Sequence, residues 1–232
     1  MRIDKFICAV TDYSRSDIKR LAKEKAIRVD NHFITDTGFK IDPELSKVFV
    51  FDDIIGALKP RFFMLNKPQD VICATTDSHH KTVLDLLDEP RQSALQIVGR
   101  LDKDTTGLVL ITDDGQWNHR VTSPNRQCFK HYLVTLTSAL DASLIDQFRQ
   151  GILLKNETKK TRPATLNILD THRAELFIQE GKYHQVKRMF AACGNHVGAL
   201  HRHAVGDIQL DKNLAVGAYR PLTQNEIDLF ND

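Results

Sequence analysis

The segment that most constrains the fold is an apolar run in the middle of the chain, Val109-Leu110-Ile111-Thr112, closed by Asp113-Asp114-Gly115. The run has the length and β-branched content of a buried strand, and Asp-Asp-Gly is typical of a turn. Arg100 and Asp102 precede it, in a stretch bounded by Gly99 and Gly107. We therefore expect Asp102 in a loop at the mouth of a buried strand, where a rigid scaffold presents reactive side chains. An isolated Arg-x-Asp more often only caps a turn or forms a local ion pair, so the function of Asp102 needs further support.

The size and charge of the chain are those of a globular protein with an uneven charge distribution. The 232 residues, 41% of them hydrophobic, suffice for one large domain or two unequal ones. The net charge is only +2, but residues 1–28 carry eight Lys or Arg against four acids, whereas residues 29–59 carry three against six. A basic N-terminal lobe is therefore masked by an acidic neighbour.

Several classes of protein are disfavoured by what the sequence lacks. The four cysteines form no Cys-x-x-Cys pair, and the histidines have no third ligand at metal-binding spacing, so no metal site is expected. There is no glycine-rich phosphate loop, and hence no nucleotide cofactor is expected. The charged N-terminus does not resemble a signal peptide, and no stretch approaches 18 apolar residues. We expect a soluble, cytoplasmic protein that needs no cofactor and does not bind a membrane.

The first 59 residues predict a small domain with a basic helix. Ile3, Phe6, Ile7 and Val10 share one helical face, and Ser14 or Ser16 can cap a second helix that runs to Lys25. A strand over residues 26–29 then turns at residues 30–32. Four cations fall on the outer side of the second helix and could neutralise RNA phosphates, although a solvated helix face is the alternative: Arg15, Lys19, Arg20 and Lys23.

A second domain is expected from residue 60, after the linker Lys59-Pro60. Strands are predicted over 61–65, 130–136, 174–179, 197–203 and 206–210, with a further N-terminal-domain strand over 47–51, and Ile97-Val98 leads into the Gly99–Leu108 segment. Helices are predicted over 82–87, 116–121, 141–150 and from the middle of 180–190 to Cys193, and residues 155–173 are predicted to be irregular. Ser123-Pro124-Asn125 is expected to close the helix over 116–121.

Motifs along nearly the whole chain resemble those of two protein families. Residues 1–59 resemble the S4 RNA-binding domain in Arg2-x-Asp4-Lys5-Phe6-Ile7, Ser14-Arg15-Ser16 and Ile27-Arg28-Val29-Asp30, with His32 where that domain usually has glycine. The string Gly99–Leu108 resembles the catalytic motif of the pseudouridine synthases that modify ribosomal RNA, of the RsuA type. Asn66-Lys67-Pro68, Lys130-x-Tyr132 and the segment 180–189 match other motifs of these enzymes.

This resemblance implies an α+β fold: an S4-like domain over 1–59, and a catalytic domain over 60–232 with a mixed, mainly antiparallel sheet flanked by helices. It implies that Asp102 is the nucleophile, that Tyr132 stacks on uracil and helps to remove the C5 proton, and that Lys187 orients Asp102 and keeps it ionised. Because neighbouring helical residues point about 100° apart, Arg188 would contact RNA instead. The remaining implied RNA or substrate contacts are Arg100, which would hold or replace the flipped nucleotide, Leu200 under the base, and more weakly Lys182, His184 and Gln185.

The function implied is the isomerisation of one uridine of 16S ribosomal RNA to pseudouridine by a monomer. The RNA could be free or part of a partly assembled small-subunit particle. Two alternatives stay open: a synthase that acts on 23S ribosomal RNA, and an RNA-binding assembly factor that has kept the fold without the chemistry.

Overall fold

The computed structural model describes residues 1–43, 45–56, 59–123 and 128–231. The chain divides into two compact units, Met1–Pro60 and Arg61–Asp232, each with a hydrophobic core of its own. Among the described residues, no helix has the length and apolar character needed to cross a membrane.

The first unit packs two helices on a small antiparallel sheet with strand order β2-β1-β3-β4. Ser14 begins the second helix with a capping box that it shares with Asp17. Ile18 and Leu21 are buried as the helical pattern predicts. In the turn after β1, Asp30 takes the left-handed conformation, with φ 51°. The elements are α1 (Ile3–Val10), α2 (Arg15–Lys23), β1 (Ile27–Val29), β2 (His32–Phe33), β3 (Val48–Val50) and β4 (Asp53–Ile55).

The second unit is a nine-stranded mixed sheet with helices on its faces, and its main strand order is β13-β5-β7-β11-β8-β10-β9. Its strands are β5 (Phe62–Lys67), β6 (Gln96–Val98), β7 (Thr106–Thr112), β8 (Lys130–Leu136), β9 (Thr165–Ile168), β10 (Arg173–Ile178), β11 (Val197–Val205), β12 (Ile208–Gln209) and β13 (Tyr219–Pro221). Its α-helices are α3 (Gly115–Thr122), α4 (Ser143–Gln150), α5 (Gln185–Ala192) and α6 (Gln224–Asp228), and two 3-10 turns span Leu84–Leu86 and Gln92–Ala94.

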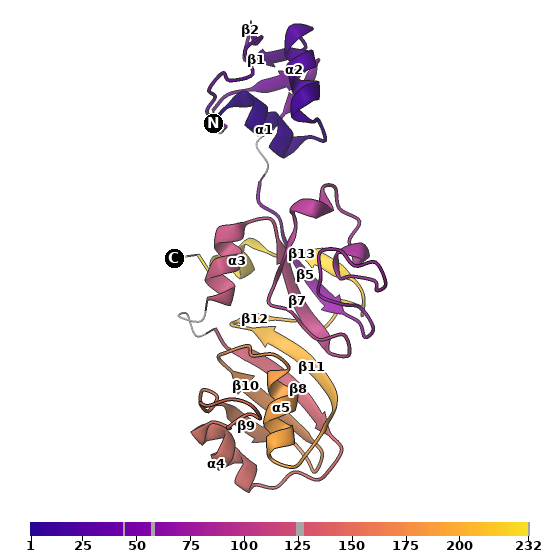
Figure 1. The fold of residues 1–232 in the computed structure, drawn as a ribbon, viewed down its shortest axis with the longest axis vertical. Helices are drawn as coiled ribbons and strands as arrows, with labels where there is room; N and C mark the ends of the chain where they lie inside the picture. Colours follow the sequence, from indigo (N-terminus) through magenta and orange to yellow (C-terminus); the bar gives the residue numbers. More distant parts are fainter. Residues whose placement is uncertain (44, 57–58, 124–127, 232) are drawn as a thin grey trace. The chain divides into compact units, whose positions relative to one another are not determined.

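Strand β7 joins the two halves of this sheet. It pairs with β5 antiparallel along one edge. Its other edge pairs with β11 in parallel at the start of β7 and with β6 antiparallel at the end. Within unit 2, β5 and β13 lie on one side of this junction and β8, β9 and β10 on the other (Figure 1). The loop that carries Asp102 enters β7 at its start, so it lies where the two halves of the sheet meet.

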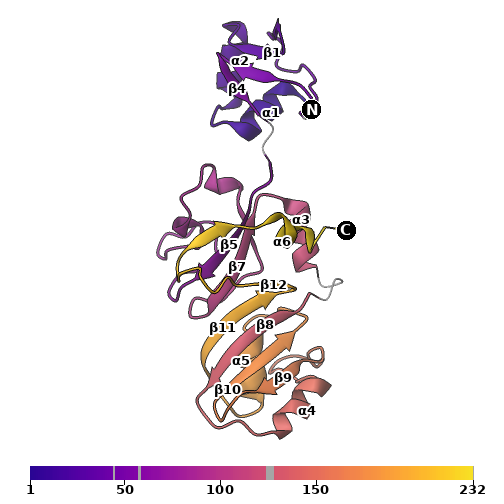
Figure 2. The same ribbon diagram turned by 180° about the vertical axis from the view of Figure 1, so that it is seen from behind.

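The burial of β7 explains its continuous apolar sequence. Val109 and Ile111 belong to one core cluster, whereas Leu108 and Leu110 belong to another that includes Trp117 of α3. A strand covered on both faces has no polar alternation. Strand β8 differs, because Tyr132, Val134 and Leu136 are buried while the residues between them are more exposed. Figures 1 and 2 show α5 on one face of β8, β10 and β11.

The sequence pattern missed the shorter elements. The helix expected over 82–87 is a single 3-10 turn, and β9 lies in the segment expected to be irregular. β4, β13 and α6 have at most five residues each, which is too short for a clear periodicity. The helix expected over 116–121 is α3, but most of its expected closing segment, 124–125, lies outside the described residues.

Candidate active site

The loop between β6 and β7 is held tightly against β11. Gly99 and Gly107 bound it with φ values of 76° and 102°, a backbone region that favours glycine. A Cβ atom on Gly107 would lie 2.3 Å from the carbonyl oxygen of Arg202 in β11, so only glycine fits there. Within the loop, the amide of Thr105 donates to the carbonyl of Asp102 across a turn.

Two buried cations bind the backbone of this loop. Lys67, which is 0% exposed, donates through Nζ to the carbonyls of Pro68, Lys103 and Thr105 at 2.9, 3.1 and 2.8 Å. Arg202, which is 2% exposed, donates to the carbonyls of Leu108 and Gly99, both at 2.8 Å. These hydrogen bonds hold the loop against strands β5 and β11, which carry the two cations.

Neither cation was assigned a role from the sequence. Asn66-Lys67-Pro68 was noted only as a recurring motif, although a lysine inside an apolar strand is itself a signal that it has buried partners. Arg202 follows Leu200 and His201 in the strand predicted over 197–203, and it gave no comparable signal.

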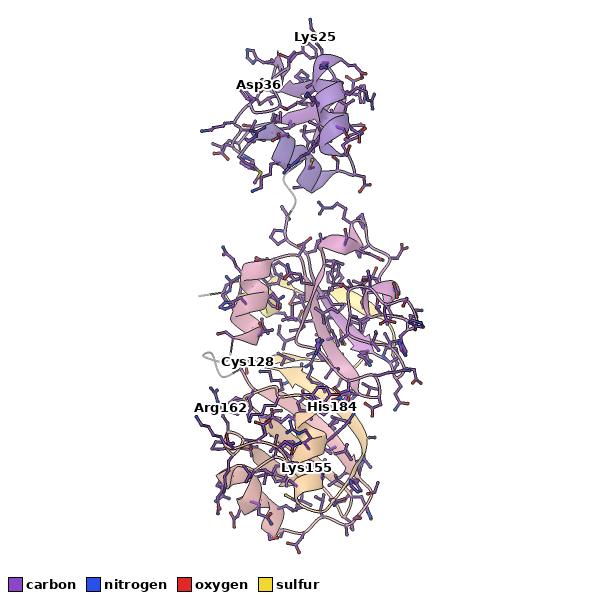
Figure 3. All side chains as sticks on the ribbon, in the orientation of Figure 1. Lys25, Asp36, Cys128, Lys155, Arg162 and His184 are labelled. Atoms are coloured by element: carbon purple, nitrogen blue, oxygen red, sulfur yellow. The ribbon has the colours of Figure 1, made fainter. Side chains whose placement is uncertain are left out.

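Asp102 projects from the loop toward the start of α5. Its carboxylate lies 3.1 Å from Nζ of Lys187 and 3.5 Å from Nε2 of His184, the residue before the helix. Lys187 also contacts the carboxylate of Asp104 at 2.5 Å. The ion pair expected between Lys187 and Asp102 is therefore present, and Lys187 bridges two acids of the same loop. Figure 3 shows His184 where the two halves of the sheet meet.

The charges of this cluster stabilise one another. Burial lowers the pKa of Lys187, but the hydrogen bonds and charges of Asp104 and Asp102 outweigh it, so the pKa is raised. The hydrogen bond from Lys187 lowers the pKa of Asp104 against a smaller opposing effect of burial. The lysine is thus held as a cation between two carboxylates.

A small hollow of about 90 Å³ opens beside Asp102. Tyr132 of β8 and Leu200 of β11 are both buried and line it, and Arg100 is exposed at its edge. Lys182, His184, Gln185 and Lys187 complete one wall. A larger cavity of about 670 Å³ adjoins it and shares Arg100, Asp102 and Tyr132. The residues named for chemistry from the sequence therefore converge on one site, with an aromatic ring and an apolar side chain beside the carboxylate.

Three residues expected to meet RNA are instead occupied within the protein. Arg188 does not line the Asp102 hollow, because it donates to the carbonyls of Tyr183 and Lys155 and to Glu157. Gln185 is buried; its side chain donates to Glu180 and accepts from the amide of Lys182. Nζ of Lys182 also pairs with Glu157. We assign these side chains to holding the segment before α5, because Arg188 and Lys182 both pair with the carboxylate of Glu157 and the Gln185 amide is bonded to Glu180.

Four basic residues of unit 1 lie on the exposed side of α2. Arg15, Lys19, Arg20 and Lys23 are all exposed on α2, with Ile18 and Leu21 on the buried side. Arg20 forms weak ion pairs with Asp17 and Glu24 at 3.8 and 3.5 Å. No group of three or more potential metal ligands is found among the residues that the structure describes.

Comparison with known proteins agrees with this geometry. Residues 61–192 match the family model for RNA pseudouridylate synthase. The chain is 49% identical to the ribosomal small subunit pseudouridine synthase A of Escherichia coli K12 and 44% identical to that of Haemophilus influenzae, in each case over 98% of both chains. A crystal structure of a pseudouridylate synthase covers 99% of each chain with a TM-score of 0.72 and 42% identity. The site around Asp102 thus lies in the fold of an enzyme. The chain belongs to the RNA pseudouridine synthase family.

Proposed function

We propose that this enzyme isomerises a uridine of small-subunit, 16S, ribosomal RNA to pseudouridine with Asp102 as the nucleophile. The observation that carries the proposal is the placement of Asp102 beside Tyr132 and Leu200 in one hollow, with Lys187 3.1 Å away. The substrate class follows the names of the full-length relatives, which are small-subunit ribosomal RNA synthases.

The reaction needs a bond exchange without a change of redox state. The C1′–N1 bond breaks with its electron pair on N1, the uracil turns, and C5 bonds to C1′. C5 then loses its proton while N1 gains one, so the atoms balance. The Asp102 carboxylate adds either to the base or to C1′ and is released at the end. Lys187 holds that carboxylate in position, and the Tyr132 ring stacks on the base while its hydroxyl assists removal of the C5 proton.

A uridine in folded RNA reaches this hollow only after leaving its stack. Arg100 is exposed at the edge of the hollow, and a planar guanidinium can stack in the vacated space or bind a phosphate. We assign Arg100 that role. Leu200 supports the base from below.

The first unit serves as an S4-like RNA-binding module in this proposal. Its helix α2 presents four exposed cations, of which only Arg20 has acidic partners in the described residues. Such cations contact phosphates and carry little information about the base sequence. The enzyme acts as a cytoplasmic monomer, on RNA that is free or in a partly assembled particle.

Release of tritium from C5 of labelled uridine tests the chemistry. We expect the enzyme to release tritium from 16S ribosomal RNA or small-subunit particles, and Asp102→Ala to release none above background. Asp146→Ala, which changes an exposed aspartate of α4, is the matched control and should behave as the unchanged enzyme.

Each other outcome has a definite meaning. Equal release by Asp102→Ala would remove Asp102 from the mechanism. Release only from 23S ribosomal RNA would reassign the substrate. RNA binding without release from any substrate would favour an assembly factor.

A further inference from the structure

A second group of charged residues borders the larger cavity beside the Asp102 hollow. Lys130 stands two residues before Tyr132 on β8, so both side chains project from the same face of the strand. Arg202 of β11 pairs directly with Tyr132. All three side chains line the cavity of about 670 Å³. Two cations therefore flank the aromatic ring that is expected to stack on uracil.

Among the residues that the structure describes, these two cations have no carboxylate partner. Nζ of Lys130 donates to the carbonyl of Cys128 at 2.8 Å, and Arg202 donates only to the carbonyls of Leu108 and Gly99. Within residues 1–43, 45–56, 59–123 and 128–231, no carboxylate lies within ion-pair distance of either side chain. Burial lowers the pKa of Lys130; Cys128 opposes that shift, and the charges of Arg202 and Arg162 add to it. Lys187, which lines the smaller Asp102 hollow, bridges two carboxylates instead.

Arg202 is buried and Lys130 is half-buried. A cation withdrawn from water without an anionic partner is costly, and an arriving anion offsets that cost. The nucleotide expected in the hollow brings its own anions, the phosphates on either side of its ribose. Two residues of a strand span about 7 Å. This spacing lets Tyr132 stack on the base while Lys130 reaches past the ribose to a phosphate. The uracil itself is neutral and cannot satisfy these charges.

We propose that Lys130 and Arg202 form a phosphate subsite that binds one of the two phosphates flanking the flipped uridine. Arg202 also holds the Asp102 loop through Gly99, so a phosphate bound there is linked to the catalytic loop through one guanidinium. The inference rests on the proposed function, because it takes the ligand to be the RNA substrate. Lys130 is a binding and positioning residue in this account, and the reacting atoms meet Asp102 and Tyr132.

The subsite is tested by removing the charge of one RNA phosphate and, separately, the charge of Lys130. Short target RNAs are made with a methylphosphonate, which removes the charge of one phosphate, on the 5′ or the 3′ side of the modified uridine. Their dissociation constants are measured by fluorescence anisotropy on full-length chains that carry Asp102→Asn, so that the uridine is not converted. One of the two neutral linkages should weaken binding roughly tenfold when Lys130 is present.

Lys130→Met should weaken binding of the unmodified RNA by a similar factor and make it insensitive to that same linkage. The salt-dependence slope should also fall by about 1. Lys130→Arg should keep the sensitivity, and Lys212→Met, at an exposed lysine elsewhere in unit 2, should leave it unchanged. If Lys130→Met does not fold, Lys130→Gln retains a donor for the Cys128 carbonyl and takes its place.

The proposal is overturned if neither methylphosphonate weakens binding, or if both weaken it equally with and without Lys130. A separate measurement distinguishes this failure from failure of the proposed function. Tritium release by the unchanged enzyme from the same RNA establishes that the RNA is a substrate. Release without coupling to Lys130 refutes only the phosphate subsite, whereas absence of release both from this RNA and from small-subunit particles refutes the proposed function.

Discussion

Two lysines hold the Asp102 loop by opposite physical means. Lys187 reaches it from α5, is a quarter exposed, and binds the carboxylates of Asp102 and Asp104. Lys67 reaches it from β5, is fully buried, and binds three backbone carbonyls. The pKa of Lys187 is raised by its acids, whereas burial lowers the pKa of Lys67 against the weaker pull of distant charges.

This difference shows that different residues maintain the charge around Asp102 and the backbone conformation of its loop. Lys187 sets the electrostatics around Asp102, the proposed nucleophile, and contributes little to the core. Lys67 supplies donors that the loop backbone needs, because a buried carbonyl without a donor is expensive. Changes at the two lysines should therefore affect different measurements.

The largest effect should come from Lys187→Met. Asp102 and Asp104 would be left as neighbouring carboxylates without a cation, and we expect kcat for tritium release to fall by roughly 10²–10³-fold. The free energy of unfolding should change by less than about 1 kcal/mol, because the pair is partly exposed. Single-turnover rates and urea unfolding measure the two quantities.

Arg188→Met is the matched control on the same helix, since Arg188 contacts Glu157 and two carbonyls outside the hollow. It should keep kcat nearly unchanged. An unchanged kcat in Lys187→Met, or an equal loss in both variants, would contradict the electrostatic role of Lys187.

Lys67→Met should show the reverse pattern, with stability as the main loss. Three carbonyls lose their shared donor, and we expect the free energy of unfolding of unit 2 to fall by roughly 2–4 kcal/mol. Trp117 is the only tryptophan and is buried in unit 2, so its fluorescence reports this unit alone. Stability equal to or above that of the unchanged protein would show that desolvation of the ammonium outweighs its three bonds.

The smallest effect should come from Asp104→Asn, and it should depend on pH. Because the hydrogen bond from Lys187 lowers the pKa of Asp104, the folded state binds that proton less readily than the unfolded chain does. The resulting stabilisation is present above the ordinary pKa of about 4 and is lost as pH falls through the lower folded value. Since Asp104 is largely exposed, the difference at pH 7 should stay below about 1 kcal/mol.

Melting temperatures followed through Trp117 between pH 2.5 and 7 test this window. The difference between the unchanged protein and Asp104→Asn should shrink toward zero at the acid end. A difference that stays constant with pH would mean that the carboxylate charge is not what Lys187 stabilises at Asp104.

The sequence by itself determined the local parts of this molecule. The apolar run of β7, the Ser14 cap of α2 and the alternation of β8 are encoded in neighbouring residues, so their periodicity predicted them. The motifs also predicted that Asp102, Tyr132, Lys187 and Leu200 belong to one site. Edge elements such as β13 and α6 were missed, because they depend on pairing and packing with distant segments.

Only the tertiary structure decided what each charged side chain binds. The motifs predict an RNA contact for Arg188, and the structure adds a contact with Glu157; they predict no role for Arg202, which binds the Asp102 loop because β11 runs beside it. The physical reason is that a long cationic side chain binds whatever acceptor the fold brings within a few ångströms. Periodicity and capping act within a few residues, whereas Arg202 and Gly99 are 103 positions apart and meet only because β7 and β11 pair in parallel.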